Sequence, residues 1–235
     1  MSPVSENLQR VRQQVSNACS RVGRPPEAVT LIAVSKTFPI DSIREAVASG
    51  QSHFGESRVQ EAAPKIEALP SSLHWHFIGG VQRNKVRKIL QSFEVIHAID
   101  SLRLATYTDD VAKDLGIVPK IFLQVNIGDE PSKGGFESES LRREMENLLE
   151  LKRLDIIGLM CIPPAGDHPE AGRPWFVKLR DLRDTLENKF GVKLNDLSMG
   201  MSGDFEIAVE EGATYIRVGS SIFGNRSYRV DGELG

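Results

Sequence analysis

The chain has 235 residues, of which 40% are hydrophobic, and a formal net charge of −3 from 29 basic and 32 acidic residues. This near balance excludes a global attraction to nucleic acid or to an anionic membrane surface, and we expect neither as a partner. Two cysteines, Cys19 and Cys161, are too few for a disulfide framework, and the amino terminus is polar. Because no apolar run approaches the ~20 residues of a membrane span, we expect a cytoplasmic protein.

The first expected element is an amphipathic helix over residues 5–22. Ser5 is the expected N-cap, and Gly23 followed by prolines 25 and 26 ends the helix. Its apolar residues recur at helical spacing and form one stripe: Leu8, Val11, Val15, Cys19 and Val22.

Strand and helix patterns then alternate to the end of the chain. Eight apolar segments are expected to be strands: 29–35, 52–54, 73–78, 94–99, 120–127, 155–161, 196–199 and 213–218. Apolar residues at helical spacing separate them, as in Val59, Ala63 and Ile66. This repetition predicts a parallel sheet with right-handed crossovers. Eight units in this length favour a closed (β/α)8 TIM barrel, a single domain over 1–235 with an extra N-terminal helix, over an open doubly wound sheet.

Lys36 is the most informative residue, because it ends the apolar first strand. The carboxyl ends of the strands form the working face of such a barrel, where a lysine amine can act on a ligand. An ordinary lysine has a pKa of about 10.4 and is almost wholly protonated at pH 7. Burial at an apolar strand end favours the neutral amine, so Lys36 is a candidate nucleophile.

The seventh and eighth strands end in loops suited to a phosphate group. Ser202–Gly203 and Gly219–Ser220 allow close backbone approach and supply hydroxyl donors. Such residues also serve as ordinary N-caps and turn residues. Arg217 interrupts the apolar eighth strand, and its charge needs a partner. That partner is either a core carboxylate or an acceptor on a ligand.

Ordered motifs along the chain resemble the YggS/PROSC family of pyridoxal phosphate homeostasis proteins. They include Ala-Val-Ser-Lys-Thr at 33–37, Trp-His-Phe-Ile-Gly at 75–79, Ser-Lys-Gly-Gly at 132–135, Leu-Ser-Met-Gly-Met-Ser at 197–202 and Arg-Val-Gly at 217–219. The resemblance covers nearly the whole chain after the first helix. It implies a barrel similar to the N-terminal domain of alanine racemases, without their second domain.

The resemblance also implies the cofactor and its site. Lys36 would hold pyridoxal 5'-phosphate as an aldimine, and Arg217 would face the pyridine nitrogen. The phosphate would lie at Ser202, Gly219 and Ser220, and the ring near Ile78. Ser57 would also contact the cofactor, although the family usually has Asn at that position. Cys161 stands where the family commonly has Thr.

An arginine opposite the pyridine nitrogen leaves that nitrogen unprotonated, which makes the cofactor a weak stabiliser of carbanions. A racemase also needs a second base opposite Lys36. The three tyrosines, Tyr107, Tyr215 and Tyr228, are not expected at such a place. We therefore expect a carrier in vitamin B6 homeostasis rather than an enzyme, a monomer that buffers the cofactor or delivers it to apo pyridoxal phosphate enzymes. The alternatives are a weak amino-acid racemase and an aldolase-like barrel that binds a sugar at Lys36.

His74 and His76 share one face of the third expected strand. Histidines at this spacing can bind a metal, but no third ligand is evident in the sequence. We expect hydrogen-bonding histidines and no metal site.

Overall fold

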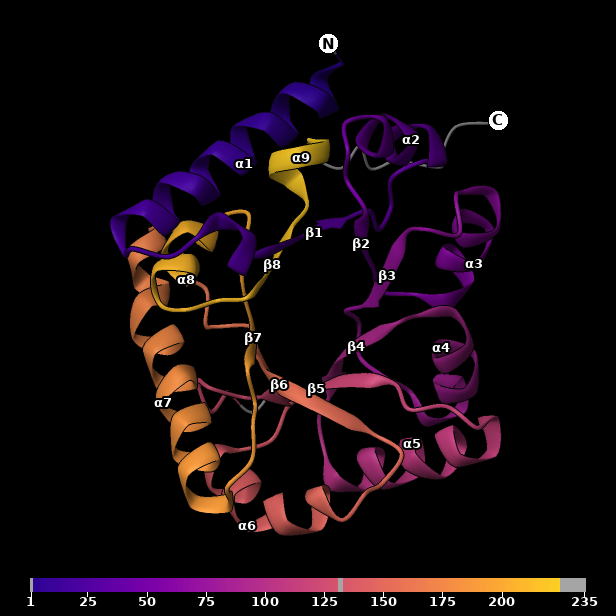
Figure 1. The fold of residues 1–235 in the computed structure, drawn as a ribbon, viewed down its shortest axis with the longest axis vertical. Coiled ribbons are helices and arrows are strands. Elements are labelled where there is room, and N and C mark those ends of the chain that lie inside the picture. Colours follow the sequence, from indigo (N-terminus) through magenta and orange to yellow (C-terminus); the bar gives the residue numbers. More distant parts are fainter. Residues whose placement is uncertain (1, 131–132, 225–235) are drawn as a thin grey trace, which may run out of the picture.

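The computed structural model describes residues 2–130 and 133–224, so Ser132 and Tyr228 lie outside the described residues. Eight parallel strands form a closed barrel in chain order (Figure 1). The strands are β1 (Thr30–Val34), β2 (His53–Glu56), β3 (His74–Phe77), β4 (Val95–Ile99), β5 (Lys120–Val125), β6 (Asp155–Cys161), β7 (Asp196–Met201) and β8 (Tyr215–Val218). The expected barrel is confirmed, with β8 pairing with β1 to close it.

The helices lie outside the strands and cover the barrel (Figure 1). They are α1 (Pro3–Arg21), α2 (Ile40–Ala48), α3 (Val59–Ala68), α4 (Val86–Ser92), α5 (Leu102–Leu115), α6 (Ser138–Leu149), α7 (Arg173–Phe190), α8 (Phe205–Glu210) and α9 (Ser220–Phe223). Short 3-10 turns occupy Pro26–Ala28, Arg83–Lys85 and Pro169–Gly172. No helix in the described part of the chain is long and apolar enough to cross a membrane.

The helix expected over residues 5–22 begins and ends earlier than expected. Ser2 is its N-cap, and the Ser2 hydroxyl accepts a hydrogen bond from the Ser5 amide at 3.3 Å. Pro3 suits the first helical position, because an N–H at that position has no acceptor within the helix and proline has no N–H. Val22, assigned to the buried stripe, is instead the C-cap and is 42% exposed.

The extra N-terminal helix α1 covers the part of the barrel that the last helix leaves open. Helix α9 has only four residues, and α1 runs across α8 and α9 (Figure 1). The Asn7 side chain donates to the Ile222 carbonyl at 2.9 Å, and Arg24 donates to the carbonyls of Val209 and Ala213. Helix α1 is therefore part of the layer of helices that surrounds the barrel.

The buried face of α3 differs from the expected one. Val59 is buried as expected, but Ala63 is exposed, and Ala62 and Lys65 turn inward. An apolar pattern could not identify this face, because the buried Lys65 belongs to an ion cluster beneath the end of β1.

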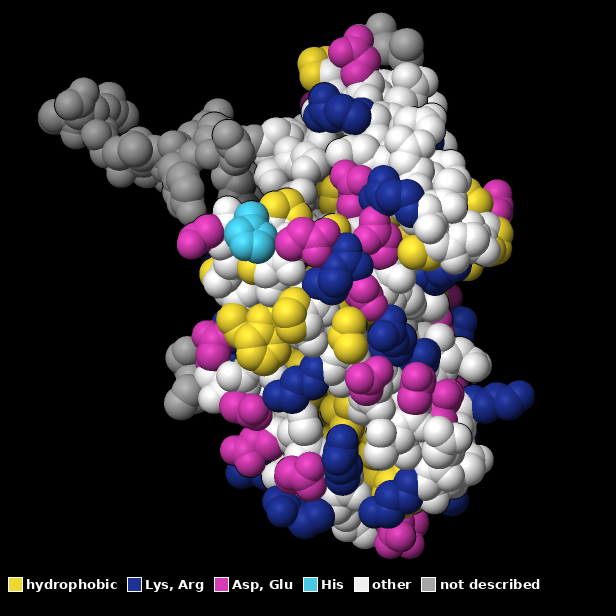
Figure 2. All heavy atoms as spheres, turned by 90° about the vertical axis from the view of Figure 1, so that its left-hand side faces the viewer, with side chains coloured by type: hydrophobic (Ala, Val, Ile, Leu, Met, Phe, Trp, Pro, Cys, Tyr) yellow, Lys and Arg dark blue, Asp and Glu magenta, His cyan; other side chains and the backbone are white. Residues whose placement is uncertain are grey.

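Basic and acidic side chains are interspersed on the face that carries α1 and α7 (Figure 2). Several form ion pairs: Arg21 with Glu206 and Glu210, and Arg173 with Glu170, Glu210 and Glu211. This face therefore presents no field of a single sign to an oppositely charged partner.

Candidate functional site

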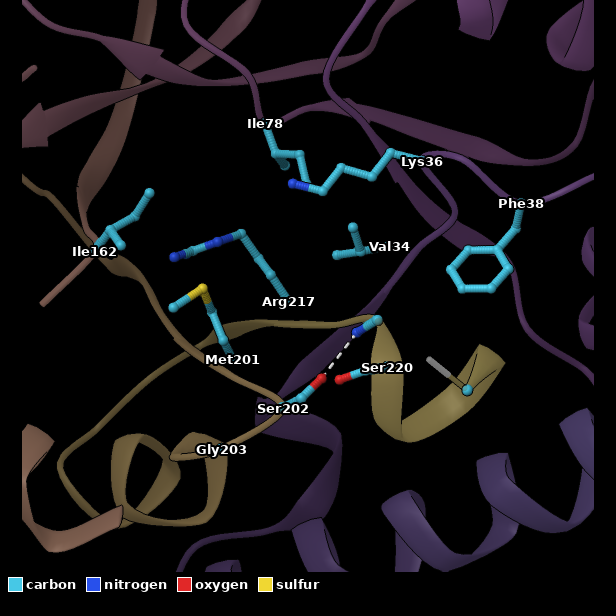
Figure 3. A pocket seen from close by; sticks show the side chains of 12 residues that line it. Val34, Lys36, Phe38, Ile78, Ile162, Met201, Ser202, Gly203, Arg217 and Ser220 are labelled. Carbon is cyan, nitrogen blue, oxygen red and sulfur yellow. Dashed lines mark hydrogen bonds between the residues drawn. The ribbon is translucent and has the colours of Figure 1, made fainter. Parts of the chain in front are cut away.

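A cavity of about 570 Å³ opens at the carboxyl ends of the strands. Six of the seven expected site residues line it: Lys36, Ile78, Ser202, Arg217, Gly219 and Ser220 (Figure 3). The Lys36 side chain enters from the loop after β1 and ends beside Ile78, while the serines lie on the opposite side, after β7 and β8. The guanidinium of Arg217 lies between these two sides.

Ser57 is the expected residue that the structure does not bring to the cavity lining. Its backbone instead packs against Gly79, where an added Cβ would lie 2.4 Å from the Ser57 carbonyl oxygen. Strand β2 continues to Glu56, two residues beyond its expected end. Ser57 therefore begins the turn after β2, and its contact with a ligand stays a prediction.

Lys36 lies just beyond β1, which ends at Val34, so it does not occupy the last strand position as expected. The Phe38 amide donates to the Ser35 carbonyl at 3.1 Å, and Thr37 adopts a left-handed conformation with φ of 70°. This tight turn carries the chain out of the strand at Ser35. It thereby sends the Lys36 side chain over the barrel mouth.

A buried ion cluster holds this turn on both sides of Lys36. The ammonium of Lys65 donates to the Ser35 carbonyl at 2.9 Å and to carboxylate oxygens of Glu56 and Glu61 at 2.8 Å each. The Ser35 hydroxyl donates to Glu56 at 2.7 Å, and the Thr37 amide donates to Glu61. The residues that flank Lys36 are thus fixed by charge-assisted hydrogen bonds.

The two carboxylates of this cluster differ in their environment. Burial raises the pKa of Glu56, and the hydrogen bonds from Lys65 and Ser35 oppose that rise. Burial also acts on Glu61, but its hydrogen bonds from Lys65 and Thr37 lower its pKa overall. Glu56 therefore depends on Lys65 to remain charged.

Arg217 reaches across the barrel interior and is only 5% exposed. It donates to the Ser198 hydroxyl at 2.7 Å and to the Cys161 carbonyl at 2.9 Å. Among the described residues no carboxylate forms an ion pair with it, and burial lowers its pKa. Of the two expected kinds of partner, the core carboxylate is therefore not the one found. A buried cation without a carboxylate suits an acceptor on a ligand.

The two loops expected to hold a phosphate group lie side by side. The Ser202 hydroxyl accepts from the amides of Gly219 and Ser221 at 3.2 and 3.4 Å. Gly219 also passes close to β1, because an added Cβ would lie 3.4 Å from the Val34 side chain and carbonyl. Backbone and hydroxyl donors therefore gather at one side of the cavity (Figure 3).

Four apolar side chains that complete the cavity walls were not expected as site residues from the sequence: Val34, Phe38, Ile162 and Met201. Val34 and Met201 end β1 and β7, Ile162 directly follows β6, and Phe38 lies in the turn after β1. A position at the carboxyl end of a strand is therefore the signal that could have identified them. Ile162 and Met201 are 38% and 36% exposed, which is unusual for large apolar side chains. Cys161, just before Ile162, is fully buried with its pKa raised to about 12 by burial, as expected of a small apolar filler.

The histidines of β3 take two different roles. His74 is half-exposed and contacts Glu94 at 2.6 Å. His76 is buried and lies 3.0 Å from ring nitrogens of both His53 and His97. The expected hydrogen bonding is present, although His74 and His76 do not share one network. The described part of the chain holds no cluster of three or more side chains arranged to bind a metal.

Comparison with known proteins agrees with this geometry. The family model "Alanine racemase, N-terminal domain" matches residues 7–227. An alanine racemase structure from Clostridium difficile, 16% identical with a TM-score of 0.71, shares the fold over 96% of this chain and 58% of its own. The chain is thus an alanine racemase-like barrel that corresponds to 58% of that racemase chain.

Relatives with much higher identity cover almost the whole chain. The pyridoxal phosphate homeostasis protein of Aquifex aeolicus is 45% identical over 95% of this chain and 98% of its own, and that of Escherichia coli K12 is 40% identical over 97% and 99%. The structure of PipY from Synechococcus elongatus with PLP bound is 41% identical, with a TM-score of 0.83 over 94% of this chain and 100% of its own. The chain belongs to the family of pyridoxal phosphate homeostasis proteins, which confirms the expected family.

Proposed function

We propose that this protein binds pyridoxal 5'-phosphate through Lys36 and serves vitamin B6 homeostasis by holding and releasing the cofactor. The observation that carries the proposal is the cavity in which an amine, a buried guanidinium and a group of hydroxyl and amide donors face one space. This set fits an aldehyde, a pyridine nitrogen and a phosphate on one flat molecule. The aldehyde of the cofactor supplies an electrophilic carbon that forms a C=N bond with a primary amine and releases water.

Each of the six expected residues in the cavity lining has a distinct task in this proposal. Lys36 supplies the amine, and the ion cluster around Lys65 keeps its backbone in place. Arg217 donates to the ring nitrogen and, because its guanidinium does not lose a proton in proteins, leaves that nitrogen unprotonated. Ser202, Gly219 and Ser220 bind the phosphate, and Ile78 packs against the ring.

We propose a carrier rather than a racemase because the described residues that line the cavity include no second base opposite Lys36. Tyr107 lies 4.5 Å from the Arg83 guanidinium on the outer side of the barrel. Tyr215 packs in the barrel interior against Phe122 and the histidines. Neither tyrosine lines the cavity in the described part of the chain. Only a slow exchange of the α-proton of added amino acids, limited to Lys36 as base, is expected. Rapid racemisation of D- or L-alanine would contradict the carrier role.

Absorbance spectroscopy tests the proposal. Purified protein titrated with pyridoxal phosphate is expected to develop a visible absorbance band that the free cofactor and the Lys36→Ala variant do not give. Lys88→Ala is the matched control, since Lys88 is exposed on α4 and should leave the band unchanged. If Lys36→Ala kept the band, Lys36 would not be the point of attachment.

The proposal extends to the domain organisation, the oligomeric state, the recipients of the cofactor and the location of the protein. We propose that the whole chain, 1–235, is one domain that acts as a monomer and hands the cofactor to apo pyridoxal phosphate enzymes. Both cysteines, Cys19 and Cys161, are buried and unpaired. Free thiols suit the reducing cytoplasm, where we place the protein.

A further inference from the structure

A line of polar side chains crosses the barrel interior from the cavity to the opposite rim. The Arg217 guanidinium lies 2.7 Å from the Ser198 hydroxyl, which lies 2.8 Å from Nδ1 of His97. Nε2 of His97 lies 3.0 Å from Nδ1 of His76, and Nε2 of His76 lies 3.0 Å from Nδ1 of His53. The line connects five strands, because these residues come from β8, β7, β4, β3 and β2 in that order.

The direction of every hydrogen bond in this line follows from its arginine end. Arginine only donates, so the Ser198 oxygen accepts from Arg217. Ser198 is fully buried, and His97 is the only other partner of its hydroxyl among the described residues. The single hydroxyl proton must therefore go to Nδ1 of His97, since otherwise it would be buried without an acceptor.

The same reasoning fixes the tautomer of each imidazole. A neutral imidazole that accepts at Nδ1 carries its proton on Nε2. His97 therefore donates from Nε2 to Nδ1 of His76, and His76 donates from Nε2 to Nδ1 of His53. The reverse direction would bring two donors to the Ser198 oxygen and leave its own proton unpaired.

The surroundings keep the two inner histidines neutral. Burial lowers the pKa of His76 to about 3 and lowers that of His97 well below its ordinary value, and neighbouring cationic groups act in the same sense. Phe122 stacks on His97, with ring centroids 4.6 Å apart. Neutral rings in a buried interior can hold one ordered hydrogen-bond pattern.

We propose that Ser198, His97, His76 and His53 form a directional hydrogen-bond relay that positions the Arg217 guanidinium in the cavity. These are positioning residues, because among the described cavity-lining residues only Arg217 belongs to the line. The relay's role toward a ligand rests on the proposed function, because Arg217, at the cavity end of the relay, would face the pyridine nitrogen of the cofactor. At the other end, His53 stacks on His74, with ring centroids 4.5 Å apart, at the amino-terminal rim of the barrel.

Nitrogen-15 NMR of the protein without cofactor tests the relay itself. The relay predicts that His53, His76 and His97 all show a protonated Nε2 and an unprotonated Nδ1 at neutral pH. A protonated Nδ1 on His76 or His97 would overturn the inferred direction. The exposed His168 lies outside this line, so it is the internal reference and should average between tautomers.

Two substitutions at His97 test the positioning role. Gln at this position can accept from Ser198 and donate toward His76, whereas Leu can do neither. Cofactor titration should show a dissociation constant close to wild type for His97→Gln and at least about tenfold weaker binding for His97→Leu. Ser198→Ala, which removes the acceptor for Arg217, should weaken binding in the same way.

The outcomes separate the relay from the proposed function. Equal cofactor affinity of folded wild-type, His97→Leu and Ser198→Ala proteins would overturn the positioning role. If wild-type protein failed to bind the cofactor, the proposed function would fall and the role of the relay toward it would fall too. The tautomer measurement would in that case still decide whether the relay exists.

Discussion

Replacing Lys65 by methionine tests whether the buried ion cluster maintains the turn that carries Lys36. The Lys65 ammonium makes three hydrogen bonds of 2.8 to 2.9 Å, and its side chain is 7% exposed while that of Glu56 is 0% exposed. Methionine fills a similar volume but leaves Glu56 as a buried, unpaired carboxylate. Breaking a buried pair from one side costs about 3–5 kcal/mol of unfolding free energy.

For a chain of this size, that loss corresponds to a fall in melting temperature on the order of 10 °C. Urea denaturation followed by circular dichroism at pH 7 measures it, with Lys88→Met on the exposed face of α4 as the matched control. Because the loop after β1 loses its anchor, Lys65→Met should also bind pyridoxal phosphate more weakly than the control.

Two further measurements would test whether the unpaired Glu56 carboxylate causes this loss of stability. Without Lys65 the pKa of Glu56 rises further, so Glu56 takes up a proton more readily as the pH falls. The stability gap to wild type should then narrow toward pH 5. The double variant Glu56→Gln/Lys65→Met removes the unpaired charge and should be more stable than Lys65→Met alone. A cost below about 1 kcal/mol, or no gain in the double variant, would refute the reasoning.

Other consequences can be measured separately. Gly158→Ala should cost at least about 3 kcal/mol, because its Cβ would lie 1.8 Å from a carbonyl oxygen of β7, whereas Gly80→Ala meets nothing within 4 Å and should be nearly neutral. Equal stability of these two variants in urea would contradict this packing. The relay histidines bind fewer protons in the fold than in the unfolded chain below about pH 6.5, so acid destabilises the protein. In His97→Gln, the slope of unfolding free energy against pH, taken from urea curves near pH 5 to 6, should fall by about 1 kcal/mol per pH unit, and an unchanged slope would count against a neutral His97. Cys161 is fully buried with a pKa of about 12, so alkylation by iodoacetamide at pH 7 should require unfolding. Rapid labelling of folded protein, read by mass spectrometry, would contradict that burial.

The barrel could be predicted from the sequence because strand and helix periodicities alternate cleanly. Once the strands were assigned, the barrel placed all their carboxyl ends on one face. This predicted that Lys36 and Arg217 lie close together, and both line the same cavity. The strand ends themselves were less accurate. Neither the extension of β2 to Glu56 nor the left-handed turn at Thr37 has a signal in apolar patterning, so the carboxyl ends of the first two strands were shifted by one or two residues.

The buried polar groups could not be predicted from sequence patterns. Lys65 on α3 occupies a position that an apolar stripe would leave to solvent, and only the barrel brings it to Glu56 and Ser35. The relay depends on residues from strands far apart in the chain, such as His97 and Ser198, which are 101 positions apart. They come together only when the barrel closes, so no short sequence spacing predicts their hydrogen bond.

The central claim is that the Lys36 amine captures the aldehyde of pyridoxal phosphate, and borohydride reduction with peptide mapping tests it most directly. Reduction of the cofactor-loaded protein should fix the cofactor on the peptide that contains Lys36 and leave the other lysines unmodified at stoichiometric loading. A protein that carries the adduct on other lysines, with Lys36 unmodified, would contradict the account.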